Sequence, residues 1–172
     1  MAFAKHLMFL SISAATCGLS INHASAQAGP NPPFTSYAAK FSCGLLAADS
    51  DVVKGTYATS INIHNPQATV PVTFAKKFVL ANPEGQHPGA IVIHTDTLGP
   101  DIAERVDCPL IRQVLDTTAS HIEGFIVLEV LPQGQFRPVL DVVGKYSARS
   151  TGATSSVTSF NVTRYEGKWI TK

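Results

Sequence analysis

Apolar and polar residues alternate along most of the chain, with a period of two that is typical of half-buried β-strands. Residues 36–44 show the pattern clearly. Tyr37, Ala39, Phe41 and Cys43 fall at every second position of this segment, and successive side chains of a strand point to opposite faces. We therefore expect a strand here whose buried face includes the cysteine.

Similar segments recur between clusters of Gly, Pro, Asn and Asp, which favour turns. They predict further strands at residues 55–66, 69–81, 90–95, 102–108, 123–131, 138–148 and 155–165. The continuous apolar run of residues 125–130 indicates a central strand that is buried on both faces. Lys76 and Lys77 indicate that their strand lies at an edge of the sheet, where charge discourages pairing with other chains.

One segment has a helical pattern instead. Pro109 suits the first turn of a helix, where its missing amide hydrogen is not needed. The apolar stripe that follows consists of Leu110, Ile111, Val114 and Leu115. We therefore predict a mainly β fold, an antiparallel, immunoglobulin-like sandwich of two sheets with one short helix near 109–116, whose strand order stays open.

The first 26 residues have the organisation of a signal peptide. Lys5 and His6 precede an apolar stretch at residues 7–19, and the sequence Ala-Ser-Ala at 24–26 has the form that a signal peptidase accepts. We expect cleavage before Gln27 and export to the periplasm or the extracellular space. A membrane-spanning helix is the alternative, but the apolar stretch is shorter than the roughly 20 residues that a span needs, and no later stretch comes near that length.

The chain of 172 residues is long enough for one domain and too short for two ordinary ones. Prolines in residues 27–35 predict a flexible leader, and residues 36–172 then form a single domain. Removal of residues 1–26 takes away one of the 13 Lys and Arg residues and none of the 12 Asp and Glu residues. The mature chain is formally neutral, which gives no reason to expect a nucleic-acid partner.

Two cysteines, Cys43 and Cys108, remain after the expected cleavage. An even pair in an exported chain is most simply a disulfide. A redox-active or metal-binding pair is the alternative, but these cysteines lack the C-x-x-C spacing that lowers the pKa of a thiol. We therefore predict a structural Cys43–Cys108 bridge.

Several segments together carry a resemblance to a known group of proteins. They are Tyr37–Gly44, Gly55–Pro66, Leu98–Pro100 with Val106–Cys108, Phe125–Val127 and Asp141–Tyr146. In this combination the chain resembles small exported bacterial proteins of uncharacterised function, over most of its mature length. The resemblance implies a signal peptide, one sandwich-like domain and a cysteine in each of these two places, and it implies no catalytic residues.

Motifs for enzymatic chemistry are few. The chain has no Gly-x-Ser-x-Gly elbow, and we assign no catalytic residue and no cofactor. A hydrolase with a dispersed site that uses His64, His94 or His121 stays open as the alternative to a binding module, and His87 could join these histidines in space. His94 and Asp96 would lie on one face of a strand, and they are the candidate ligands for a metal ion.

Four carboxylates lie close together in the sequence, at Asp96, Asp101, Glu104 and Asp107. We call them the acidic window. They would suit calcium, which prefers oxygen ligands, but Arg105 among them favours a solvated acidic loop.

Loops are also where a sandwich offers recognition sites. If the domain is a binding module, we expect the loop at 96–101 to bind the partner, with 82–89 and 147–156 as the other candidate loops. The partner would be a protein, a glycan or a cell surface.

Overall fold

The computed structural model of the protein describes residues 33–47, 53–82, 92–150 and 158–171. The expected signal peptide, His87, most of the leader and parts of the candidate loops at 82–89 and 147–156 lie outside the described residues. Among the residues described, no helix has the length and apolar character needed to cross a membrane.

The described part of the chain contains nine strands and one short helix. In chain order these are β1 (Phe34–Leu46), β2 (Gly55–His64), β3 (Val72–Leu80), β4 (Val92–Leu98), β5 (Ala103–Asp107), α1 (Cys108–Val114), β6 (His121–Val130), β7 (Asp141–Ser150), β8 (Thr158–Tyr165) and β9 (Lys168–Ile170). The mainly β prediction with one short helix is confirmed, and the ends differ by a few residues. β9 has no counterpart in the prediction, because three residues are too few to show a period.

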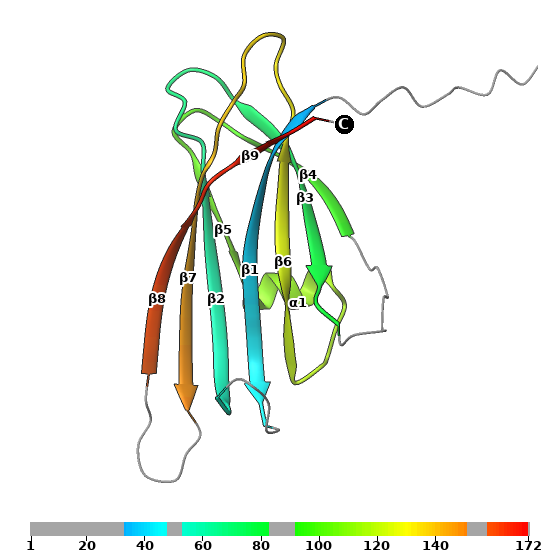
Figure 1. Cartoon of the computed structure of the whole chain (residues 1–172), viewed down its shortest axis with the longest axis vertical. Helices are drawn as coiled ribbons and strands as arrows, with labels where there is room; N and C mark the ends of the chain where they lie inside the picture. The colour runs from blue at the N-terminus through cyan, green and yellow to red at the C-terminus, as the bar shows by residue number, and fades with distance from the viewer. Residues whose placement is uncertain (1–32, 48–52, 83–91, 151–157, 172) are drawn as a thin grey trace, which may run out of the picture.

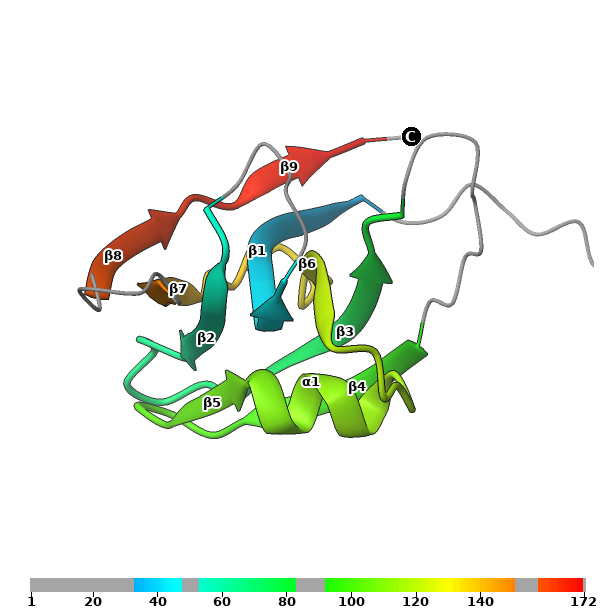
Figure 2. The same ribbon diagram turned by 90° about the horizontal axis from the view of Figure 1, so that it is seen from below.

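The strands pair antiparallel in the order β4-β3-β6-β1-β2-β7-β8, in one sheet that does not close. β5 adds to β2, and β9 adds to β1. β1 and β2 pair only at one end, where Gly44–Leu46 faces Gly55–Tyr57. The sheet therefore has two halves, β9-β1-β6-β3-β4 and β8-β7-β2-β5, which lie side by side in Figure 1 and face each other in the view from below in Figure 2.

The hydrophobic core lies between these two halves. Tyr37, Ala39, Phe41 and Cys43 are at most 2% exposed, which confirms the predicted buried face of the first strand. Buried side chains of the other elements complete the core, among them Ile61, Ile63, Phe74, Phe78, Val106, Ile111, Ile126 and Leu128. Full burial of one such side chain stabilises a fold by about 1.5–3 kcal/mol.

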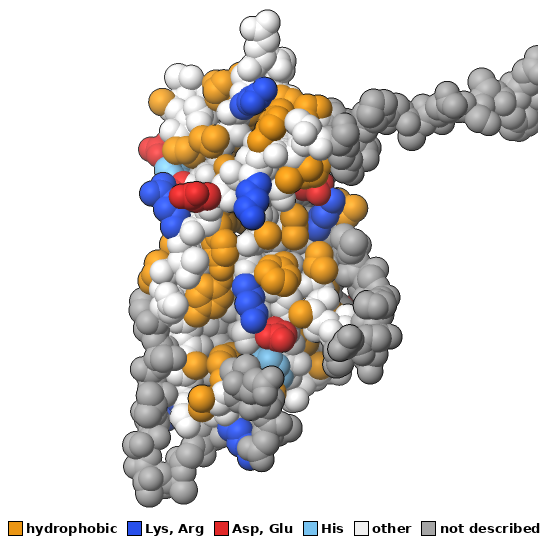
Figure 3. Space-filling model, viewed as in Figure 1, with side chains coloured by type: hydrophobic (Ala, Val, Ile, Leu, Met, Phe, Trp, Pro, Cys, Tyr) orange, Lys and Arg blue, Asp and Glu red, His pale blue; other side chains and the backbone are white. Residues whose placement is uncertain are grey.

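β6 lies at the centre of its half of the sheet, between β1 and β3. Ile126 and Leu128 are buried, whereas Phe125 on the opposite face is 42% exposed. The prediction that this strand is buried on both faces is therefore wrong, because no described element covers its outer side. Figure 3 shows that the outer surface mixes hydrophobic side chains with charged ones.

β3 is not an edge strand, because it pairs with β4 on one side and with β6 on the other. The edge prediction from Lys76 and Lys77 is wrong because both charges have partners within the fold. Lys76 is buried and contacts Asp96 and Glu104, whereas Lys77 pairs with Glu129 on the other face of the strand.

Candidate functional site

Two carboxylates of the acidic window hold the buried Lys76. Its Nζ lies 2.6 Å from Oδ2 of Asp96 on β4 and 2.7 Å from Oε1 of Glu104 on β5. Burial by itself lowers the pKa of Lys76, but hydrogen bonds and charges from both carboxylates outweigh it and raise the pKa above its ordinary value. Asp96 and Glu104 are therefore strand residues that link the two halves of the sheet, and the prediction of a solvated loop is wrong for them.

The other two carboxylates of the acidic window have different partners. Asp101 lies 3.0 Å from Nε2 of His64, at an exposed position. Asp107 caps α1 by accepting a hydrogen bond from the main-chain nitrogen of Leu110, at 3.3 Å. Within the described ranges, no group of three or more His, Cys, Asp or Glu side chains is placed to hold a metal ion. The structure thus divides the window among three separate interactions.

The described histidines lie on three different strands. His64 ends β2 beside Asp101. His94 on β4 meets the ring of Phe78 edge to face, with centroids 6.2 Å apart. It shares a face of β4 with Asp96, as expected, but the carboxylate of Asp96 is engaged with Lys76. His121 begins β6, and its imidazole contacts side chains of two other strands.

His121 forms a side-chain pair with Ser42, because β1 and β6 run side by side. Oγ of Ser42 lies 3.0 Å from Nε2 of His121. The ring of Tyr57 contacts the imidazole edge to face, with centroids 5.6 Å apart. Gly44 lies between Tyr57 and His121 in the sheet register and adopts a φ of +105°, where a Cβ would fall 2.1 Å from the main-chain oxygen of Ser120. A glycine at this position allows the three strands to bring the side chains together.

A depression of about 490 Å³, which we call the His121 depression, opens beside this pair. Its lining consists of Leu80, Ala81, Asn82, Thr117, Ala119, His121, Ile122 and Glu123. The carboxylate of Glu123 lies 3.4 Å from Nζ of Lys40, but both side chains are about half exposed, so the pair is weak. The depression thus combines an imidazole, a carboxylate and a carboxamide with apolar surface.

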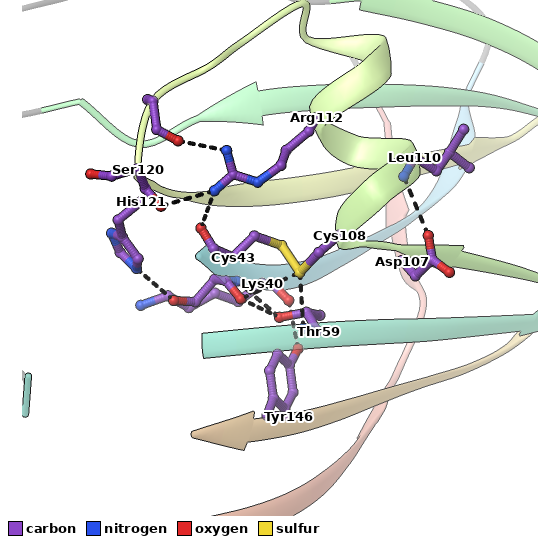
Figure 4. The surroundings of a disulfide bond; sticks show 12 residues. Lys40, Cys43, Thr59, Asp107, Cys108, Leu110, Arg112, Ser120, His121 and Tyr146 are labelled. Atoms are coloured by element: carbon purple, nitrogen blue, oxygen red, sulfur yellow. Dashed lines mark hydrogen bonds between the residues drawn. A yellow bond between two sulfur atoms is a disulfide. The ribbon is translucent and has the colours of Figure 1, made fainter. Parts of the chain in front are cut away.

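Two links hold the chain beside His121, as Figure 4 shows. Cys43 on β1 and Cys108 on α1 lie at disulfide distance, with their sulfur atoms 2.08 Å apart. Arg112 on α1 donates hydrogen bonds to the main-chain oxygens of Cys43, Ala119 and Ser120, at 2.9, 2.5 and 3.1 Å. The segment that leads into His121 is therefore held rigidly against β1.

Sequence reasoning names His121 as one of several histidines but misses Ser42 and Glu123. Their meeting depends on the pairing of β1 with β6, which are far apart in the chain. The alternation in β1 does place Ser42 and Lys40 on the face opposite the core, and this is the signal that could have pointed to them.

Comparison of the chain with protein-family models, with curated proteins and with solved structures finds no match.

Proposed function

We propose that the mature protein is an exported, non-enzymatic binding module and that the His121 depression holds its ligand. The observation that carries this proposal is the fixed position of His121 at an accessible depression, between Ser42 and Tyr57. A binding group that is already ordered loses little conformational entropy when its ligand arrives. The separate surroundings of His64 and His94 also favour a binding module over an enzyme whose histidines converge.

The ligand that we propose is a sugar unit of a glycan. Sugar hydroxyls both donate and accept hydrogen bonds, and the imidazole of His121, the carboxylate of Glu123 and the carboxamide of Asn82 can serve them. Leu80 and Ile122 offer apolar surface to the carbon-bound hydrogens of the ring. Ligand sites of this kind combine apolar surface with a few well-placed polar groups.

Titration of the isotopically labelled mature protein with glucose, galactose, N-acetylglucosamine and their short oligomers tests the proposal. We expect one of these sugars to shift the NMR signals of His121 and Asn82, and we expect His121→Ala to weaken that binding at least tenfold. His94→Ala is the matched control and should bind as the unchanged protein does. Shifts confined to another surface, or none at tens of millimolar sugar, would refute the glycan site.

The Ser42–His121 pair also favours a second candidate function, ester hydrolysis. In that reaction Oγ of Ser42 adds to an ester carbonyl while His121 takes its proton and passes it to the departing alcohol, and water then releases the acid. Glu123 lies on the same strand face as His121 but contacts Lys40, so it does not orient the imidazole.

A fluorophosphonate probe distinguishes this candidate from the binding module. Hydrolysis requires that the probe label the protein and that Ser42→Ala abolish the labelling. A protein that stays unlabelled but binds a sugar supports the binding module alone.

The proposal also covers the export of the protein and the architecture of its domain. We propose that residues 1–26 direct export and are removed before Gln27, and that the two facing halves of the sheet correspond to an immunoglobulin-like sandwich. Expression of the full chain in a bacterium, fractionation of the cells and N-terminal sequencing test the export. A product in the cytoplasm that begins at residue 1 or 2 would contradict it.

A further inference from the structure

One edge of β1 is completed by a succession of different partners. The main-chain groups of alternate residues of a strand point to the same side. At one end of this edge, Gly44–Leu46 pairs with β2. Next, the main chain of Ser42 exchanges hydrogen bonds with the Thr59 hydroxyl, at 2.9 Å in both directions.

The edge continues past Ser42 towards the start of β1. The main-chain nitrogen of Lys40 donates to the Tyr165 hydroxyl, and its oxygen accepts from the Tyr146 hydroxyl. At the far end, Ser36 lies opposite Lys168 of β9. The side chains of β2, β7 and β8 thus replace a neighbouring strand along the middle of this edge.

Ala38 is the one interruption along this edge in the described chain. Its N–H and C=O point to the same side as those of Lys40 and Ser36, because antiparallel strands alternate with a period of two residues. None of the described residues offers them a hydrogen-bond partner on that side, and Ala38 is exposed. A donor and an acceptor therefore stand side by side at an accessible position.

A hollow of about 320 Å³ lies at this interruption, between β1 and the turn from β8 to β9. Its lining consists of Ser36, Ala38, Arg164, Tyr165, Glu166, Lys168 and Ile170. Arg164 contacts Asp141 at 3.0 Å but remains largely exposed, and Lys168 is exposed as well. Asp141 offsets the charge of Arg164, so Lys168 is the cation of the lining that is best placed to attract an anion.

We propose that this hollow binds the C-terminal residue of a peptide whose preceding residues turn away from β1. Ala38 C=O would accept the N–H of that residue, Ala38 N–H would donate to its carboxylate, and Lys168 would balance the negative charge. Tyr165 and Ile170 offer contacts to its side chain. Capture of a chain end by main-chain groups and charge is a known mode of peptide recognition.

The neighbours of Ala38 set the length of what can bind. Ser36 is paired with β9, and the main-chain nitrogen and oxygen of Lys40 are hydrogen-bonded to Tyr165 and Tyr146. Since a strand advances about 3.4 Å per residue, the free stretch of edge accommodates the main chain of a single residue. A chain end fits this space, whereas a strand that continued along β1 would collide with both neighbours. The site is separate from the His121 depression and does not depend on the function proposed for it.

N-acetyl-alanine and its N-methylamide are matched probes for this site, because they share the acylated amine and differ in the carboxylate. We expect N-acetyl-alanine to shift the main-chain NMR signals of Ala38 and Lys168 and the methylamide to bind at least tenfold more weakly. Lys168→Gln should weaken N-acetyl-alanine binding about tenfold, whereas Arg149→Gln, which removes a cation elsewhere on the sheet, should not change it.

Ala38→Pro removes the proposed donor without removing a bond to β6, and it should abolish binding. Lys168 is exposed, so Lys168→Gln should leave the fold intact and still tests the proposal if the proline variant fails to fold. Equal binding of the two probes, no shift at Ala38, or shifts confined to His121 would overturn the proposal. The last of these outcomes would leave the function proposed for the His121 depression standing.

Discussion

The hydroxyl of Tyr146 donates a hydrogen bond of 2.6 Å to the main-chain oxygen of Lys40, although their strands are not neighbours in the sheet. The main-chain nitrogen of Lys40 donates to Tyr165, and the two phenols bond to each other. Since the Tyr146 hydroxyl uses its hydrogen in the bond to the main-chain oxygen of Lys40, the Tyr165 hydroxyl must be the donor in the bond between the two phenols. The four groups therefore form a closed ring of hydrogen bonds that ties the two halves of the sheet together.

This ring makes stability fall at alkaline pH. Burial raises the pKa of Tyr146 above its ordinary value of 10.0, and the hydrogen bond with Tyr165 raises it further. The unfolded chain then loses the phenol proton first, so the stabilisation is complete below about pH 10 and falls as the pH rises beyond it. We expect Tyr146→Phe to cost about 1 kcal/mol at pH 7 and to flatten part of the alkaline decline.

Urea unfolding of both proteins between pH 7 and pH 11 measures this effect. Tyr57→Phe is the control, because its hydroxyl bonds to Val53 outside the ring. An alkaline decline of the same steepness in Tyr146→Phe and in the unchanged protein would show that the ring does not control it.

Lys76→Met should destabilise the fold strongly, because it leaves the carboxylates of Asp96 and Glu104 close together without a cation. Loss of one partner of a buried ion pair costs about 3–5 kcal/mol, and the partial exposure of Asp96 and Glu104 favours the lower end. The triple variant Lys76→Met, Asp96→Asn, Glu104→Gln removes all three charges, and we expect it to recover most of the loss. Guanidinium unfolding compares the variants, and a triple variant less stable than Lys76→Met would refute the charge argument.

Asn65 should be among the least replaceable polar residues. Its buried carboxamide donates to the main-chain oxygens of Val70, Leu98 and Gly99, and its oxygen accepts from the nitrogen of Gln67. Asn65→Asp exchanges the donor for a second acceptor that faces three carbonyls, so we expect it to cost more than Asn65→Ala, which should cost about 2–3 kcal/mol. Thermal unfolding at pH 7 ranks the two variants, and the reverse order would contradict this role.

The Cys43–Cys108 bridge should contribute a large part of the stability. Its sequence separation is 65, and in the chain-entropy model a loop of this size stabilises the fold by about 4 kcal/mol. We expect the double variant Cys43→Ala, Cys108→Ala to melt well below the unchanged protein. Added reductant should lower the melting temperature of the unchanged protein and leave that of the double variant as it is. Peptide mapping without reductant checks the bridge directly, and two free thiols would disprove it.

The sequence predicts local features of the fold better than the relations between distant segments. The alternation in residues 36–44 predicts the buried face of β1, and Pro109 marks the first turn of α1, because both signals involve neighbouring residues. Lys76 misleads for the opposite reason. A lysine in a strand suggests exposure, and only the approach of Asp96 and Glu104 from β4 and β5 makes its burial favourable.

The candidate site follows the same rule. The acidic window is conspicuous in sequence because its carboxylates are close along the chain, yet they serve separate partners in space. Ser42 and His121 are inconspicuous, because 79 positions separate them in the chain. A pair of this kind becomes visible only when the strand order is known.

The pairing of β1 also determines when the protein can fold. β1 pairs along most of its length with β6, and its first residues pair with β9, where Phe34 faces Ile170. Closing such long loops costs entropy before any contact compensates for it, so folds dominated by distant pairings form slowly, over milliseconds to seconds. β1, the first strand in the chain, therefore completes its pairing only when β9, near the end of the chain, is in place. Until then its edges can pair with wrong partners.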